Sequence, residues 1–112
     1  MKVKEFIAAN EGETKLLYSD PSNPYEEIII KAVIKNGELI ITDFESADYG
    51  SSKRVITFDK ENTEKVFSFL MEKASRAPFL KLAMMMGYDN RTSTFLSQCD
   101  LLAITYENQL FI

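Results

Sequence analysis

Residues 25–44, YEEIIIKAVIKNGELIITDF, decide the fold of this chain. In residues 25–35 the apolar side chains alternate with polar ones, which is typical of a strand with one buried face. The residues assigned to that face are Ile28, Ile30, Ala32 and Ile34. Asn36-Gly37 then supplies the two positive φ angles of a type I′ turn. We therefore predict that residues 38–44 return antiparallel as the second arm of a β-hairpin.

Two further strands are predicted on either side of this hairpin. Lys15–Ser19 (KLLYS) precedes it, and the two prolines of residues 20–24 mark a loop that cannot join a ladder. Lys53–Phe58 (KRVITF) follows the hairpin. Between them, Glu45–Ser52 (ESADYGSS) is polar and rich in turn-forming residues, so we interpret it as an exposed loop at the end of the sheet.

The second half of the chain changes to helical periodicity. Asp59 is a good N-cap for a helix, and the apolar residues after it recur at helical spacing. These residues are Val66, Phe67, Leu70, Met71 and Ala74. Two more helices are predicted, Pro78–Met86 with Gly87 at its C-terminal end, and Arg91–Leu101 with Asn90 or Thr92 as its cap. Ala103–Tyr106 reads as extended and is a candidate for a last strand.

Strands followed by helices, without alternation, predict an α+β fold. We expect one domain over residues 1–112, with an antiparallel sheet of about four to five strands packed against two to three helices from the C-terminal half.

Charge and composition exclude several functions. Lys and Arg number 13 against 17 Asp and Glu, which gives a net charge of -4, the wrong sign for a generic nucleic-acid binder. The chain has no His, and Cys99 is its single cysteine. No Ser-His-Asp triad, Cys-His pair or His-containing metal site can be built from it. We therefore predict no catalytic residues, no cofactor and no bound metal.

Localisation is inferred from the absence of targeting signals. The apolar run Phe6–Ala9 is too short for a signal peptide, and no stretch is long enough to span a membrane. A lone cysteine suits a reducing compartment, and Cys99 is expected to be a small buried residue. The expected location is cytoplasmic.

Acidic residues concentrate in residues 36–50, which hold four acids and no Lys or Arg. We predict that Asp43, Glu45 and Asp48 lie close together at the sheet end, with two aromatic rings among them. Acids around exposed rings can steer and anchor a protein partner. The predicted partner-binding residues are Asp43, Phe44, Glu45, Asp48 and Tyr49. Two alternatives stay open: a merely solvated sheet end, or a carboxylate site for Mg²⁺.

Two runs of sequence carry a resemblance to a known family. They are GELIITDFESADYGSSKRVITFDKENTEKVFSFL (residues 37–70) and TFLSQCDLLAITYE (residues 94–107). In the first run, the order of strand, acidic end, Asp-Tyr loop, strand and capped helix resembles small bacterial immunity proteins of contact-dependent growth inhibition and related polymorphic toxin systems. In the second run, a short helix with a Cys leads into an isoleucine-containing strand, which resembles the ending of that family. The loop here is shorter and less acidic than in that family, and it lacks the family's Trp.

This resemblance implies a cytoplasmic, non-catalytic protein that neutralises the C-terminal domain of one cognate toxin. A nuclease toxin has a basic substrate surface, which an acidic patch could occupy. The resemblance carries over to Asp43, Asp48 and Tyr49, with Phe44 and Glu45 added by proximity. Neither nucleic acid nor a membrane is an expected partner. The alternatives are an adaptor or homo-oligomerising domain, and a metal-dependent hydrolase that uses Asp43, Glu45 and Asp48.

Overall fold

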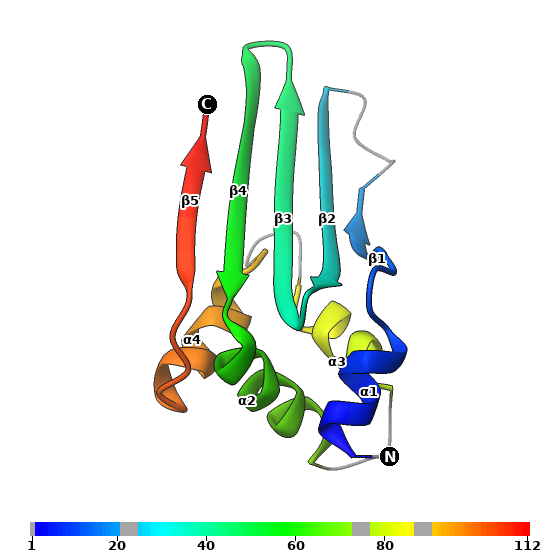
Figure 1. The fold of residues 1–112 in the computed structure, drawn as a ribbon. Helices are drawn as coiled ribbons and strands as arrows, with labels where there is room; N and C mark the ends of the chain where they lie inside the picture. The colour runs from blue at the N-terminus through cyan, green and yellow to red at the C-terminus, as the bar shows by residue number, and fades with distance from the viewer. Residues whose placement is uncertain (1, 21–24, 73–76, 87–90) are drawn as a thin grey trace.

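The computed structural model describes residues 2–20, 25–72, 77–86 and 91–112. In chain order its elements are α1 (Val3–Ala9), β1 (Lys15–Ser19), β2 (Glu26–Lys35), β3 (Glu38–Ala47), β4 (Gly50–Phe58), α2 (Lys60–Met71), α3 (Pro78–Met84), α4 (Ser93–Leu101) and β5 (Glu107–Phe111). The five strands form one antiparallel sheet in the order β1-β2-β3-β4-β5 (Figure 1). This confirms the predicted α+β class.

The central hairpin forms as predicted. Asn36 and Gly37 have φ angles of 53° and 76°, which a type I′ turn requires. The turn fixes the register of β2 against β3, from Lys35 opposite Glu38 to Glu26 opposite Ala47. All four residues assigned to the inner face of β2 are buried, namely Ile28, Ile30, Ala32 and Ile34.

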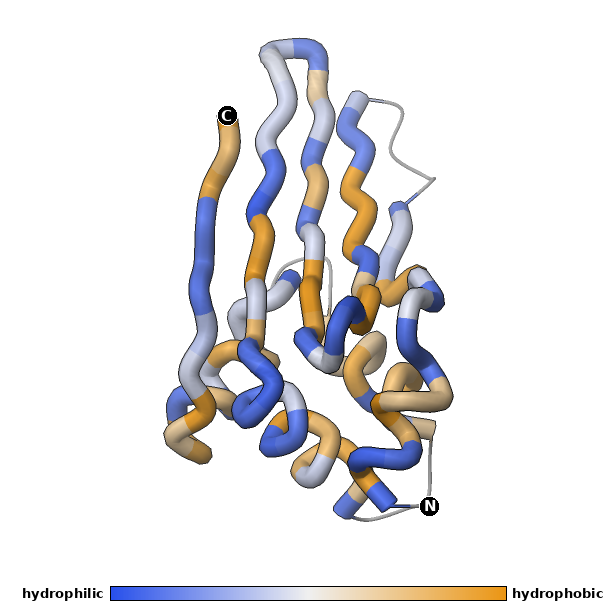
Figure 2. Tube along the Cα trace, in the orientation of Figure 1, coloured by the Kyte–Doolittle hydropathy of each residue, from blue (hydrophilic) through white to orange (hydrophobic). Residues whose placement is uncertain are grey.

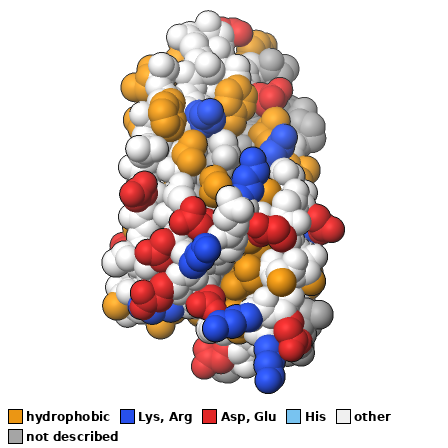
Figure 3. All heavy atoms as spheres, in the orientation of Figure 1, with side chains coloured by type: hydrophobic (Ala, Val, Ile, Leu, Met, Phe, Trp, Pro, Cys, Tyr) orange, Lys and Arg blue, Asp and Glu red, His pale blue; other side chains and the backbone are white. Residues whose placement is uncertain are grey.

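Helices cover one face of the sheet and leave the other without a described helix (Figure 1). α2 packs against β3 and β4, α3 packs against β1, and α1 packs against α2. The alternation of apolar and polar residues along the strands is visible in Figure 2. In Figure 3, hydrophobic side chains share the upper part of the helix-free face with basic ones. Its half-buried apolar residues are Ile29, Val33, Ile40, Phe44 and Val55.

The interpretation of Glu45–Ser52 as a loop is wrong. β3 continues to Ala47, β4 begins at Gly50, and only Asp48 and Tyr49 form the turn between them. The ends of β2, β3 and β4 extend beyond the helices (Figure 1). Because no core is built there, these strand ends are polar and lose the alternation that identifies a half-buried strand.

The helices follow the predicted caps with small changes of boundary. Asp59 accepts a hydrogen bond from the backbone N–H of Asn62 at 2.8 Å, and Pro78 lies in the first turn of α3. Thr92 is the N-cap residue of α4, although its side chain makes no capping hydrogen bond. The predictions for residues 21–24, Ala74, Gly87 and Asn90 lie outside the described residues.

Two elements differ from the prediction. α1 is a helix that the sequence analysis did not propose, and its Ile7 is buried against the core. The last strand is Glu107–Phe111, not Ala103–Tyr106. Ala103 has a φ of 56°, which turns the chain away from α4 before β5 begins. Among the described helices, none has the length and apolar character needed to cross a membrane.

Candidate partner-binding site

Asp43 does not lie on an exposed rim, which corrects the prediction. It belongs to the inner face of β3, opposite Ile30 on β2, and only 4% of its surface is accessible. Its carboxylate accepts a hydrogen bond from the guanidinium of Arg91, which also forms an ion pair with it. Strand alternation places Asp43 on the same face as Leu39 and Ile41, so it is shielded from any partner.

Glu45 shares the same cation. Arg91 Nη1 donates to Glu45 Oε2 at 2.6 Å, and the Glu45 side chain is largely buried. Burial by itself would lower the pKa of Arg91, but the hydrogen bonds and negative charges of Asp43 and Glu45 raise it. One guanidinium therefore pairs with two predicted site residues and balances one of their two negative charges. No local pattern of sequence indicates this pairing, because Arg91 lies 46 residues beyond Glu45.

Phe44 lies on the opposite face of the sheet from these two acids. It is half-buried on the helix-free face, between Ile29 on β2 and Lys53 on β4. Adjacent residues of a strand point to opposite faces, so Phe44 cannot form one surface with Asp43 and Glu45. The predicted cluster of five residues is therefore divided.

Asp48 and Tyr49 are exposed at the hairpin turn, as predicted. Tyr49 has 84% of its surface accessible, and its hydroxyl lies 3.4 Å from Glu45 Oε1. Both residues stand at the end of the sheet that extends beyond the helices (Figure 1). This part of the predicted site is open to a partner.

The fold adds three residues that the sequence analysis missed. Pairing of β2 with β3 brings Glu26 opposite Ala47 and Glu27 opposite Ser46, next to the turn. Tyr25 precedes them and is 74% exposed. The Asn36-Gly37 turn sets which residues of β2 and β3 face each other. A predicted β3 that continued past Phe44 would therefore have placed all three residues next to the turn. We call Tyr25, Glu26, Glu27, Asp48 and Tyr49 the acidic tip.

The acidic tip has a negative field. The pKa of Tyr49 is raised, chiefly by the charge of Glu45, with smaller contributions from burial and from the charge of Glu26. Residues 25–30 and 44–52 contain no Lys or Arg, so no cation from the paired strand ends opposes this field. The tip thus combines three exposed or half-exposed carboxylates with two exposed phenol rings.

A polar cavity of about 400 Å³ lies beside the Asp43–Arg91 pair. Its lining residues are Asp43, Ser52, Arg54, Arg91, Thr92, Ser93, Leu96, Asn108 and Leu110. Arg54 Nη1 donates to Asn108 Oδ1 at 2.8 Å. Within the described residues, no three Asp, Glu, Cys or His side chains are grouped closely enough to hold a metal ion. Because Arg91 binds both Asp43 and Glu45, these acids are engaged in an ion pair instead of forming a carboxylate site.

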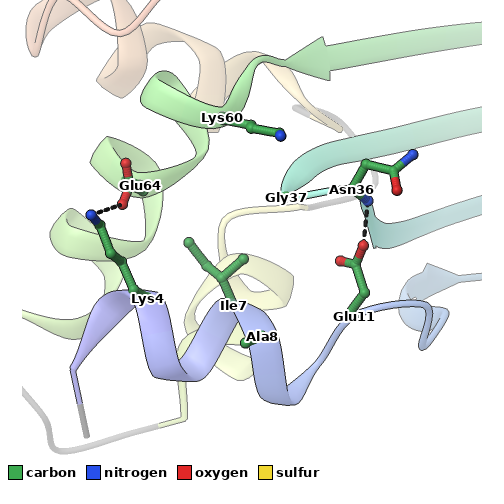
Figure 4. A pocket seen from close by; sticks show the side chains of 8 residues that line it. All are labelled: Lys4, Ile7, Ala8, Glu11, Asn36, Gly37, Lys60 and Glu64. Atoms are coloured by element: carbon green, nitrogen blue, oxygen red, sulfur yellow. Dashed lines mark hydrogen bonds and ion pairs between the residues drawn. The ribbon is translucent and has the colours of Figure 1, made fainter.

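A second cavity, of about 510 Å³, opens between α1, α2 and the β2–β3 turn (Figure 4). Ile7 and Ala8 form its apolar side, while Lys4 pairs with Glu64 across it at 3.7 Å. Glu11 accepts a hydrogen bond from the backbone N–H of Asn36. Positive and negative side chains alternate around this cavity, so it offers a charged ligand neither a mainly positive nor a mainly negative surface.

Cys99 is buried, as predicted, and burial raises the pKa of its thiol to about 12. A thiol of that pKa is protonated at neutral pH and is a poor nucleophile.

No family of known proteins, no curated protein and no solved structure matches this chain. The functional proposal therefore depends on the surface that the chain presents, and the acidic tip is its strongest feature.

Proposed function

We propose that this chain is a non-catalytic immunity protein that binds and neutralises one cognate toxin domain through its acidic tip. The observation that supports the proposal is a pair of exposed tyrosines among carboxylates, at the strand ends that extend beyond the helices (Figure 1). The sequence resemblance to immunity proteins supports the same class of function.

The chemistry of the tip favours a basic partner. Because residues 25–30 and 44–52 contain no Lys or Arg, the three carboxylates of the acidic tip attract a positively charged surface over roughly 8–10 Å at physiological ionic strength. The rings of Tyr25 and Tyr49 can then be buried at the contact, where tyrosine is one of the residue types that contribute most to affinity. A toxin that acts on nucleic acid has such a basic surface around its active site.

The shape of the tip favours inhibition by steric cover. The hairpin turn extends past the helical layer, so it can enter a cleft while the helices stay outside (Figure 1). The ladder of β3 with β4 keeps its backbone paired up to Ala47 and Gly50. A paired hairpin loses little conformational entropy on binding, and this favours slow dissociation. No bond is made or broken in this mechanism.

The proposal is tested with the protein encoded immediately upstream, expressed as its C-terminal domain. Association is measured as a function of salt for the wild type and for the combined change Glu26→Lys, Glu27→Lys and Asp48→Lys. We expect association to slow by at least tenfold and to lose most of its salt dependence. Thermal stability is expected to stay close to that of the wild type, because all three side chains lie outside the core.

The matched control reverses three exposed acids on α1 and at α2, at the other end of the molecule: Glu5→Lys, Glu61→Lys and Glu72→Lys. This control has the same net charge as the tip variant but leaves the tip intact. If both variants slow association equally, the effect is one of net charge and the tip is not the site. If neither variant changes binding, or the upstream protein does not bind at all, the proposal is wrong.

A further inference from the structure

β5 is an edge strand with an open outer side. It pairs with β4 alone, from Glu107 opposite Thr57 to Phe111 opposite Lys53, and no described element lies beyond it (Figure 1). None of the backbone hydrogen bonds outside the regular elements involves Glu107–Phe111 within the described residues. Such a row of unpaired N–H and C=O groups is a template for another strand.

The two edges of the sheet differ in their protection. β1 is interrupted by a register shift between Leu16 and Tyr18, and bulges of this kind discourage pairing with a further strand. β5 has continuous register with β4, contains no Pro or Lys, and has Glu107 as its only charged residue. β5 therefore lacks the bulge, the Pro and the Lys that commonly protect an edge strand.

Exposed apolar side chains gather at the same edge. Half of the large hydrophobic residues that are exposed in the described structure belong to residues 101–112: Leu101, Leu102, Leu110, Phe111 and Ile112. Leu110 and Phe111 are about half exposed although both belong to a paired strand. Leu110 and Phe111 point to opposite faces of the sheet, and Leu101 and Leu102 precede β5, so the exposed apolar side chains follow the length of this edge.

From this edge we infer that the chain forms a homodimer in which β5 pairs antiparallel with β5 of a second copy, with Gln109 at the two-fold axis. An axis perpendicular to the sheet keeps each side chain on its own face, so the two sheets join into one sheet of ten strands. Centring the axis on Gln109 pairs all five residues of each β5. The helices of both copies then lie on the same side.

A second copy complements β5 in charge. In this register Glu107 stands opposite Phe111 of the other copy, so no two like charges face each other. Next to Phe111 on β4 of the same copy stands Lys53, and its ammonium lies 5.5 Å from the centre of the Phe111 ring. Two strand spacings, roughly 10 Å, then separate the backbones of Lys53 and Glu107 of different copies. Their side chains are long enough to approach each other across the phenyl ring.

The apolar residues beside β5 enlarge the contact. In the antiparallel arrangement, Ile112 of one copy lies near the start of β5 in the other copy. Leu101 and Leu102 of that other copy precede its β5 at the same end. That segment is held in place because Asn62 on α2 exchanges two hydrogen bonds of 3.0 Å with Thr105. β5 is thus anchored before it pairs. A five-residue ladder is a small interface, so we expect a dissociation constant on the order of 10⁻⁵ M.

The test measures the mass of the full chain by light scattering and sedimentation equilibrium, up to about 10⁻⁴ M protein. The wild type is expected to change from one chain to two over this range. Gln109→Lys and Gln109→Glu each place like charges at the two-fold axis and should weaken dimerisation at least tenfold. An equimolar mixture of the two variants should restore it, because the charges at the axis are then opposite.

Ser19→Lys and Ser19→Glu are the matched controls, since they make the same substitutions at an exposed position of the other edge strand. They should dimerise as the wild type does. Far-UV circular dichroism checks that each variant is folded. A wild type that stays monomeric up to about 10⁻⁴ M, Gln109 variants that dimerise normally, or a mixture that stays monomeric would each overturn the inference. The inference does not depend on the proposed immunity function.

Discussion

Arg91→Met tests the most unexpected feature of the structure, the pairing of Arg91 with Asp43 and Glu45. Met keeps the length of the side chain but removes its charge, which leaves Asp43 buried at 4% accessibility without its cation. Breaking a fully buried pair costs about 3–5 kcal/mol. Because the Arg91 and Glu45 side chains are 29% and 22% exposed, water can partly replace the lost contact. We therefore expect a loss of about 2–3 kcal/mol, or about 8–12 °C in melting temperature.

The assay is urea unfolding followed by far-UV circular dichroism, since the chain has no Trp to report by fluorescence. The double variant Asp43→Leu with Arg91→Met removes both charges and should lose less than Arg91→Met alone, because replacing a buried pair by apolar residues is often neutral. Lys65→Met is the control; it removes an exposed pair with Glu61 at 3.9 Å and should change stability by less than about 0.5 kcal/mol. A loss below about 0.5 kcal/mol for Arg91→Met would refute the argument, as would a double variant that loses the sum of both single changes.

Three further predictions concern the core and the helix cap. Thr63→Val should cost about 1–3 kcal/mol in urea unfolding, and Thr63→Ser much less, because the buried hydroxyl accepts from Leu39 N at 2.9 Å and donates to Phe58 O at 3.1 Å. Cys99 should resist a thiol reagent at pH 8 and react once urea unfolds the chain, since burial raises its thiol pKa to about 12; fast labelling of the folded protein would contradict this. The hydrogen bond from the backbone N–H of Asn62 lowers the pKa of Asp59 in the folded protein. The stabilisation that Asp59 provides is therefore present above its unfolded-state pKa of about 3.9, and it is lost as pH falls through its folded-state pKa. Asp59→Ala should therefore be less stable than the wild type at pH 6, and the difference between their urea midpoints should shrink below about pH 4; a constant difference would count against the cap.

The sequence predicted the parts of the fold that a local signal determines. The Asn36-Gly37 turn and the alternation in β2 are such signals, and the hairpin and its buried face are confirmed. Asp59 and Pro78 likewise mark the starts of α2 and α3. α1 was missed because seven residues give less than two turns of helical spacing, which is too short to stand out from neighbouring patterns.

The site was harder to predict because two non-local effects decide it. The end of the sheet has no core beneath it, so its strands are polar and resemble a loop, which hid the alternation that separates Phe44 from its acidic neighbours. Arg91 reaches Asp43 across 48 positions of sequence, and no local pattern announces such a pair. Counting charge along the chain therefore located an acidic end of the molecule, but it assigned to the surface two acids, Asp43 and Glu45, that are engaged with Arg91. The carboxylates that remain exposed there come partly from β2.

The two proposals together predict the stoichiometry of the complex with the toxin. β5 and β3 both run towards the acidic tip, so the two-fold axis at Gln109 turns the tip of the second copy to the opposite end of the dimer (Figure 1). Each tip then binds its own toxin domain without contact between the two, giving a complex of two chains with two toxins. Light scattering should find this mass for the wild type at concentrations where the free chain is dimeric, and one chain with one toxin for Gln109→Lys. The rate of toxin binding per tip should be the same in both, because β5 lies outside the contact. A Gln109→Lys variant that binds the toxin more slowly than Ser19→Lys, which has the same net charge, would mean that β5 belongs to the toxin interface and not to a dimer.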